Sequence, residues 1–165
     1  WIVGTGSATY NRVGHLVFVF KVAQTLSFNE YWTDPRFQNK KPNLQGSLKQ
    51  AFGDNIYQSN AAGTQWSQAN SHHSLPDGRP NPLNVAHDTH PPRVLVGEEY
   101  IYWGGNGPKI PAKFRNFHGE DICVLRQGHK CHFSAELVTA FLVWLHSRGE
   151  NKFVSPPAEF ARIAN

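Results

Sequence analysis

The chain has 165 residues, enough for one hydrophobic core that folds without disulfides or metal ions. It is 39% hydrophobic and 17% charged, which excludes intrinsic disorder because disorder needs low hydrophobicity and high charge. No apolar run approaches the ~18 residues of a membrane-spanning helix, and two cysteines are too few for a disulfide-stabilised secreted domain. The net charge of +4 permits contact with nucleic acid or phosphorylated ligands. We therefore expect a cytoplasmic protein that does not bind membranes.

The first elements that the sequence predicts are two strands. Trp1–Gly4 is short and β-branched, and residues 5–7 form a glycine-serine turn. His15–Ala23 is a continuous apolar run rich in Val and Phe, typical of a strand buried on both faces. Methionine is absent and the chain opens in what reads as the middle of a strand. We therefore expect one domain over residues 1–165 that lacks an N-terminal segment.

A short helix is expected after the second strand. Ser27 followed by Glu30 is a capping box, and Asp34-Pro35 is a typical helix stop. The aromatic residues of this helix are expected in the core.

Residues 36–92 form a long polar segment in which Asn, Gln, Gly, Ser, Pro and His dominate. Such a stretch inside a compact domain is usually functional or disordered. Aromatic and apolar anchors recur in it, among them Phe52, Tyr57 and Trp66. We therefore interpret it as an ordered, loop-rich insertion.

The C-terminal half predicts two more strands and one major helix. The strands are expected at Arg93–Gly97 and Tyr100–Trp103. The helix begins after Ser134, a good N-cap, and runs to about His146 with apolar residues nearly all round, as in a buried helix. The predicted fold class is α+β, with a mixed or barrel-like sheet, one major buried C-terminal helix and the long polar insertion.

Several motifs along the chain carry a family resemblance. They are the opening strand and loop, the Phe-Lys-Val strand, the Glu-Tyr-Trp helix ending at Asp-Pro, and residues 37–42, 53–57, 71–74 and 102–108. Together they resemble the nucleotide modification associated domain 2 family. The resemblance implies an association with bacterial and phage systems that make modified DNA bases. More distantly, the first half is similar to PUA-like domains, including the EVE type, which are small β-barrels that hold a flipped base in an aromatic pocket.

Five residues are candidates for binding a ligand or reading a base. Asp54, Asn55 and Tyr57 place a carboxylate, an amide and a phenol within four residues, the groups that bind the edge and face of an extruded base. Asp54 taken alone is also typical of an Asp-Asn turn. Trp103 precedes glycines that let a flat ligand approach, although it could equally be a core residue. Arg12, in the first loop, is a candidate for a phosphate group.

His72 and His73 are the candidate acid–base residues, with Asp54 as orienting or catalytic carboxylate. In an extended segment adjacent side chains point to opposite sides, so one ring of the pair would face the site. The tripeptides beginning at His72 and His87 also match, weakly, the His-x-Ser/Thr pair of two-histidine phosphoesterases. Structural or solvated histidines are the alternative.

No metal or cofactor is expected. The candidate zinc ligands Cys123, His129, Cys131 and His132 do not form the two tight pairs that structural zinc sites use. We expect two reduced, unpaired cysteines.

Two functions are open at this stage. The first is recognition of a nucleotide, modified base or nucleic acid in a DNA-modification or defence system. The alternative is an enzyme that acts on a nucleotide or modified base by His/Asp acid–base chemistry. A closed pocket lined by Asp54 and a histidine of the 72–73 pair would favour the enzyme, whereas aromatics and amides without an acid–base pair would favour recognition.

Overall fold

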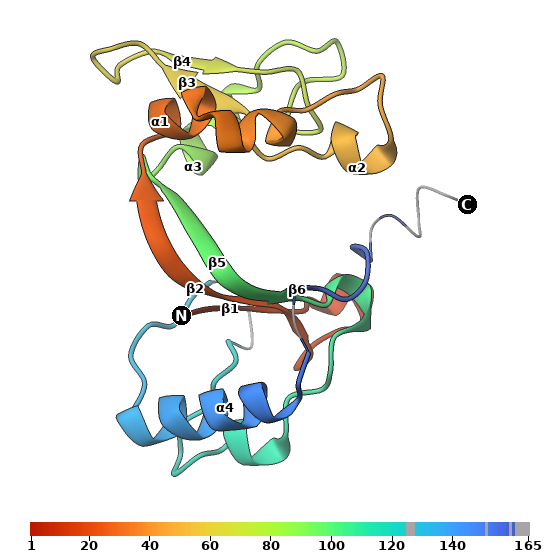
Figure 1. The fold of residues 1–165 in the computed structure, drawn as a ribbon, viewed down its shortest axis with the longest axis vertical. Helices are drawn as coiled ribbons and strands as arrows, with labels where there is room; N and C mark the ends of the chain where they lie inside the picture. Colours follow the sequence, from red (N-terminus) through yellow and green to blue (C-terminus); the bar gives the residue numbers. More distant parts are fainter. Residues whose placement is uncertain (125–127, 151, 159, 161–165) are drawn as a thin grey trace. The chain divides into compact units, whose positions relative to one another are not determined.

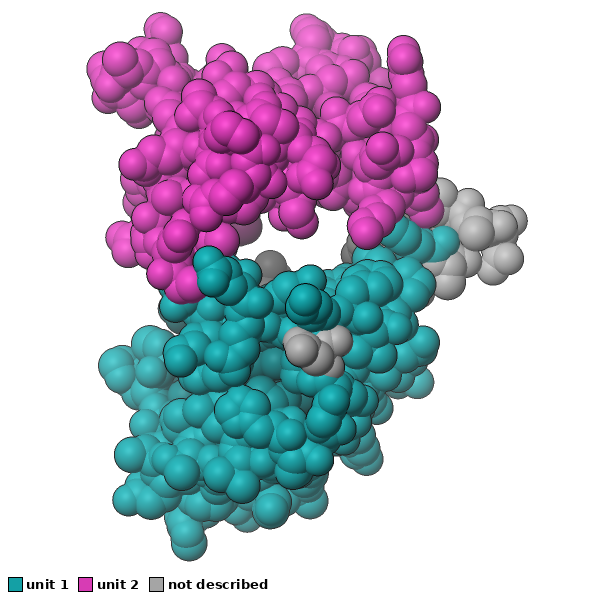
Figure 2. All heavy atoms as spheres, viewed as in Figure 1, with its two compact units in different colours: residues 1–22, 97–165 teal, residues 23–96 magenta. Residues whose placement is uncertain are grey.

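The computed structural model describes residues 1–124, 128–150, 152–158 and 160. The chain forms two compact units, shown in Figure 2. Unit 1 contains residues 1–22 and 97–165, and unit 2 contains residues 23–96. The predicted insertion, residues 36–92, lies within unit 2.

A four-stranded sheet is the framework of unit 1 (Figure 1). Its order is β1 (Ile2–Thr5), β2 (Leu16–Leu26), β5 (Val94–Tyr102) and β6 (Lys152–Phe153), and the parts of β2 after Val22 and of β5 before Gly97 belong to unit 2. β1 pairs antiparallel with β2, whereas β6 pairs parallel with β5, so the predicted mixed sheet is confirmed. The barrel is wrong: in the described part of the chain the short strands β1 and β6 are open edges and do not pair with each other. The α+β class is confirmed.

The two long strands differ from their predictions in extent and burial. β2 continues to Leu26, and its burial is confined to Leu16 and Val19. The expectation of burial on both faces is therefore wrong. The two strands predicted over residues 93–103 form one strand, β5. Gly97 lies inside it because a Cβ there would be 2.6 Å from the ring of Phe20, so this glycine serves close packing rather than a turn.

α4 (Ala135–Ser147) covers one face of this sheet in unit 1. The hydroxyl of Ser134 accepts from the backbone N–H of Leu137, as an N-cap does. Val138 and Val143 are exposed, so the helix buries one face and not its whole circumference. The residues buried in the core of unit 1 are Leu16, Val19, Ile101, Trp103, Ile110, Phe114, Cys123, Leu137, Phe141 and Leu145. Three short 3-10 helices, η1 (Ala8–Tyr10), η3 (Gly104–Asn106) and η4 (Ala112–Phe114), complete its described elements.

Unit 2 is built from short elements. They are α1 (Phe28–Thr33), η2 (Pro35–Lys40), α2 (Leu48–Ala51), β3 (Tyr57–Ser59), β4 (Trp66–Gln68) and α3 (Pro82–Asp88). The predicted capping box at Ser27 and Glu30 is confirmed, and β3 and β4 form an antiparallel pair. Residues 36–92 are thus ordered around two helices and a hairpin.

Amide side chains connect these short elements to one another. Asn29 donates to the carbonyl of Ser59 over 3.1 Å and accepts from its backbone N–H over 2.8 Å. The amide of Asn55 is buried and donates to the carbonyls of Tyr31, over 3.0 Å, and Phe37, over 3.2 Å. Polar contacts therefore order a segment that has few apolar residues. Among the described residues of either unit, no helix is long and apolar enough to cross a membrane.

Candidate functional site

A cleft of about 410 Å³ opens in unit 2. Its apolar lining comes from Phe28, Phe52, Ile56, Val94 and Leu95. Its polar lining comes from two tyrosines, two aspartates, two histidines and one arginine. This volume and this mixture of surfaces are typical of small-molecule sites.

Four of the predicted site residues line this cleft together. They are Asp54, Tyr57, His72 and His73. Asp54 follows α2, Tyr57 begins β3, and the histidines lie in the loop after β4. The cleft therefore gathers side chains from three separate parts of the unit.

Asn55 lies beside these residues in the sequence but is not part of the lining. Its side chain is 1% exposed, and both of its donor bonds go to the backbone carbonyls of Tyr31 and Phe37. Its Oδ1 atom has no hydrogen-bond partner among the described residues. Asn55 holds the turn that presents Asp54, a role different from the predicted contact with a ligand.

Trp103 and Arg12 belong to unit 1 and do not line the cleft. Trp103 is 0% exposed, and its indole N–H donates to Glu150 over 2.8 Å. A ring buried on both faces cannot stack on a base, so the predicted role of Trp103 is corrected to that of a core residue. Arg12 is half-buried in the loop between η1 and β2, where its Cβ packs against Gly6.

A hydrogen-bonded cluster of Tyr57, His73 and Asp88 forms one part of the cleft wall. Oδ2 of Asp88 lies 2.6 Å from the Tyr57 hydroxyl and 2.6 Å from Nδ1 of His73. Oδ1 of the same carboxylate lies 3.0 Å from Nδ1 of His87. Asp88 ends α3, 15 residues after His73, so no local sequence signal indicated this contact.

The protonation pattern of the cluster follows from the acceptor-only character of a carboxylate. Because an ionised carboxylate only accepts, Nδ1 of His73 is the donor to Asp88, and Nε2 is the ring nitrogen that Asp88 does not engage. Burial and the neighbouring carboxylate raise the pKa of Tyr57. Partial burial acts to raise the pKa of Asp88, but the bonds from His87, Tyr57 and His73 together lower it. Tyr57 is therefore a neutral donor and Asp88 an ionised acceptor.

The two histidine rings are neighbours, contrary to the expectation for an extended segment. The backbone N–H of Ser74 donates to the carbonyl of Ser71, so residues 71–74 form a turn. The His72 and His73 rings meet edge to face with centroids 4.3 Å apart. His72 also stacks on Phe52 at 4.6 Å. Because the segment turns, both rings line the same cleft.

Asp54 has a different environment from Asp88. Its Oδ1 accepts from the hydroxyl of Tyr31 over 2.8 Å, and the residue as a whole is exposed. Burial, together with the charge of Asp54, raises the pKa of Tyr31. The predicted pairing of Asp54 with a histidine is thus replaced: Asp88 contacts His73, and Asp54 contacts Tyr31.

The hydroxyls of the two His-x-Ser/Thr tripeptides bond to the backbone. Ser74 accepts from the N–H of Ser71, and Thr89 donates to the carbonyl of Val85 over 2.7 Å. Neither residue lines the cleft. The geometry therefore does not support the phosphoesterase arrangement.

The cysteines belong to unit 1 and are not among the residues that line the cleft. Cys123 is buried, Cys131 is exposed, and both are free. In the described part of the chain no three His, Cys, Asp or Glu side chains group as metal ligands would.

The chain was compared with protein families, curated proteins and solved structures. The family model described as nucleotide modification associated domain 2 matches residues 1–164. No curated protein and no solved structure matches the chain. Because the match extends over nearly all of the sequence, the chain belongs to the nucleotide modification associated domain 2 family.

Proposed function

We propose that the cleft of unit 2 binds a nucleotide or a modified base, and that the protein recognises this ligand in a bacterial or phage DNA-modification or defence system. The observation that carries the proposal is the convergence of Asp54, Tyr57, His72 and His73 on one cleft. Family membership supports a role in nucleotide modification. We place this function in the cytoplasm.

The aromatic lining suits the flat face of a base. Phe52 and His72 are stacked with an interplanar angle of 27°, and Phe28 meets Tyr57 edge to face. Stacking of a base on an aromatic side chain is worth about 1–3 kcal/mol and tolerates different bases. Rings at the wall of the cleft would therefore supply affinity.

The polar lining suits the edge of a base. Carboxylate, phenol and imidazole groups placed at an otherwise apolar surface fix the orientation of a ligand and select it. Asp54 and His73 offer such groups in the cleft that His72 also lines. These contacts would supply specificity.

A second function, acid–base catalysis on the bound nucleotide or base, is favoured by the contact between His73 and Asp88. A carboxylate that accepts from Nδ1 fixes the tautomer and orientation of an imidazole, and Nε2 is then available to remove or deliver a proton. Tyr57 donates to the same carboxylate oxygen and holds it in place. In this function His73 is the acid–base residue and Asp88 positions it, whereas Asp54 contacts the ligand.

The experiment that tests the binding function is ligand capture followed by mass spectrometry. The protein is incubated with a library of nucleotides and modified nucleosides, washed, and its bound molecules are identified. We expect a nucleotide or modified base to be retained, and we expect His72→Ala and His73→Ala each to reduce retention about tenfold. His132→Ala, which changes an exposed histidine of unit 1, is the matched control. A library from which nothing is retained would contradict the proposal.

The same samples separate recognition from catalysis. If the cleft is catalytic, the retained ligand is converted to a product of different mass. His73→Ala should then slow conversion about 10²–10⁴-fold. Recognition alone predicts that the retained ligand keeps its mass in the wild-type protein.

A further inference from the structure

Arg93 differs from the other arginines of unit 2. Arg36 pairs with Asp34 over 2.7 Å, and Arg79 pairs with Asp77 over 2.6 Å. Arg93 lines the cleft, and its guanidinium has no ion pair among the described residues. The unit thus places a cation at the cleft without neutralising it.

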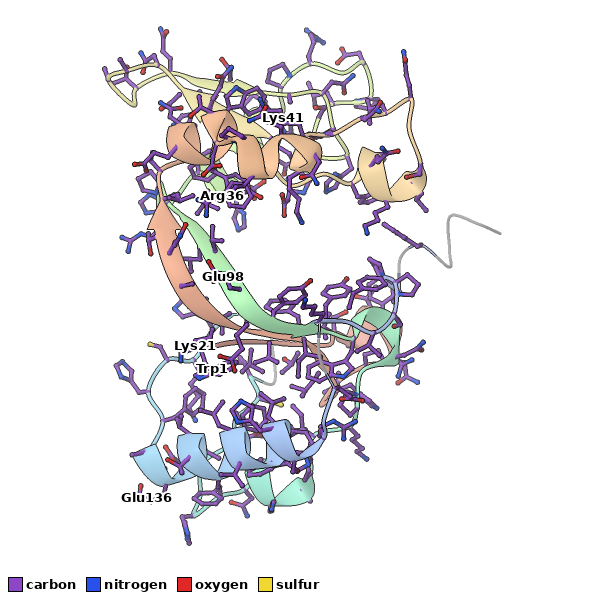
Figure 3. The ribbon with its side chains drawn as sticks, viewed as in Figure 1. Trp1, Lys21, Arg36, Lys41, Glu98 and Glu136 are labelled. Atoms are coloured by element: carbon purple, nitrogen blue, oxygen red, sulfur yellow. The ribbon has the colours of Figure 1, made fainter. Side chains whose placement is uncertain are left out.

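The lysines of unit 2 lie elsewhere. None of Lys40, Lys41 and Lys49 lines the cleft. The ammonium of Lys41, which is labelled in Figure 3, lies over the ring of Trp32, 3.9 Å from its centroid. Arg93 is therefore the residue through which this cleft would attract an anion. A guanidinium offers a planar pair of donors that matches two oxygens of a phosphate group.

The two carboxylates of the cleft have different capacities to bind a ligand. Asp88 accepts from Tyr57, His73 and His87, so both of its oxygens are already used. Among the described residues, Asp54 accepts only from the Tyr31 hydroxyl, at Oδ1. A carboxylate accepts and never donates when ionised, so Asp54 requires an N–H or O–H group from the ligand. An exocyclic amino group on a base meets this requirement, whereas the carbonyl that replaces it in uracil or hypoxanthine only accepts and would be repelled by the carboxylate.

The charges of these carboxylates and of Arg93 also determine whether each residue can bind the phosphate end or the base end of a nucleotide. A phosphate beside Asp54 or Asp88 would be repelled, whereas beside Arg93 it is attracted. The volume of about 410 Å³ lies in the range of about 300–1,000 Å³ that small ligands occupy in proteins.

We propose that the cleft selects a nucleoside 5′-phosphate whose base carries an amino group, with the phosphate bound by Arg93 and the amino group bound by Asp54. This inference rests on the proposed function, because it names the ligand class of the same cleft. The nucleotide can be free or can be one unit of a single strand, since both present the same phosphate and base edge.

The test measures dissociation constants by calorimetry for ligands that differ in one group. The probes are deoxycytidine, dCMP, 5-hydroxymethyl-dCMP and dUMP, with dAMP and dIMP as the purine pair. In the wild-type protein, the phosphate should tighten binding about 10- to 100-fold, and the amino group about tenfold. Single-stranded oligomers of dC and dU distinguish a nucleotide in a strand from a free one.

Two variants and one control show which residue binds the phosphate and which binds the amino group. Arg93→Gln should remove the gain from the phosphate and leave the preference for the amino group. Asp54→Asn should remove the amino preference and leave the gain from the phosphate. Arg79→Gln, in which the lost guanidinium is 76% exposed and outside the cleft, should change neither. Circular dichroism checks that each variant is folded.

The outcomes separate this inference from the function on which it rests. A phosphate gain that persists in Arg93→Gln, or an amino preference that persists in Asp54→Asn, would overturn the inference while nucleotide binding stands. Equal affinities for nucleosides and nucleotides in the wild type would do the same. If neither a monomer nor an oligomer binds, the inference and the proposed function both fail.

Discussion

Unit 1 is held by an apolar core that residues distant in the sequence build together, whereas unit 2 is held by side-chain amides and carboxylates that bind the backbone of short elements. In unit 1, Leu16 of β2, Phe114 of η4 and Phe141 of α4 belong to one buried cluster. In unit 2, Asn29 and Asn55 connect α1 to residues more than twenty positions away. The difference shows how a segment poor in apolar residues can be ordered and still present polar groups at a cleft.

The largest effect that this comparison predicts is on the core of unit 1. Phe141→Ala should lower the free energy of unfolding by about 3–5 kcal/mol, because a buried aromatic ring leaves a cavity. Urea denaturation of the full chain measures the loss. Val143→Ala is the matched control on the same helix, since its side chain is 65% exposed. A Phe141→Ala variant as stable as Val143→Ala would show that α4 does not carry the core.

The next effect concerns the amide contacts of unit 2. Asn55→Ala removes the donors to the carbonyls of Tyr31 and Phe37 and should cost about 1–3 kcal/mol, since buried acceptors lose their partner. Hydrogen exchange should accelerate in peptides of unit 2 more than in peptides of unit 1. Asn39→Ala, at an exposed position, is the control. Unchanged exchange in unit 2 would contradict the view that amides order it.

A smaller effect is the pH dependence that Asp88 contributes. Its pKa is lowered in the folded protein, so its ionised form stabilises the fold above the ordinary aspartate pKa of about 3.9, and this contribution is lost as the pH falls through the folded value. Wild type should exceed Asp88→Asn in stability by about 1 kcal/mol at pH 5, and the difference should shrink toward pH 2.5.

Denaturation at a series of pH values measures this difference. Glu98→Gln, which removes an exposed carboxylate of unit 1, reports the general effect of losing a negative charge. A difference between wild type and Asp88→Asn that grows as the pH falls below 4 would have the wrong sign.

The smallest effect is on thiol reactivity and leaves stability unchanged. Cys123 is buried and burial raises its pKa, whereas Cys131 is exposed. A thiol reagent should therefore modify Cys131 in the native protein and both cysteines after denaturation without reductant. Stoichiometric zinc by elemental analysis, or a missing thiol after denaturation, would contradict this account.

The parts of unit 1 that could be predicted from sequence depend on local signals. The β-branched runs indicated β1 and β2, and the Ser134 N-cap marks where α4 begins. The sequence could not show that β5 is one continuous strand. Gly97 looks like a break between two strands, and its packing against Phe20 is a contact with another strand. The sequence did not decide between a mixed and a barrel-like sheet for the same reason, since closure depends on which strands pair.

The sequence of unit 2 also contains capping motifs for two helices that were not predicted. Ser47 with Gln50 is a capping box for α2, and Asn81 with Pro82 is an N-cap followed by proline at the first turn of α3. The density of polar motifs did indicate Asp54, Tyr57, His72 and His73. Asp88 and Arg93 could not be assigned, because their contribution arises from a cleft that brings together residues far apart in the sequence.

The central claim is that the nucleotide or modified base binds in the cleft of unit 2. Hydrogen exchange with and without the ligand selected from the library tests it most directly. The account predicts slower exchange in the peptides that cover residues 52–57, 71–73 and 88–95, and unchanged exchange around Arg12 and Trp103. Protection confined to residues 4–12 or 102–108 of unit 1, with none in unit 2, would contradict it.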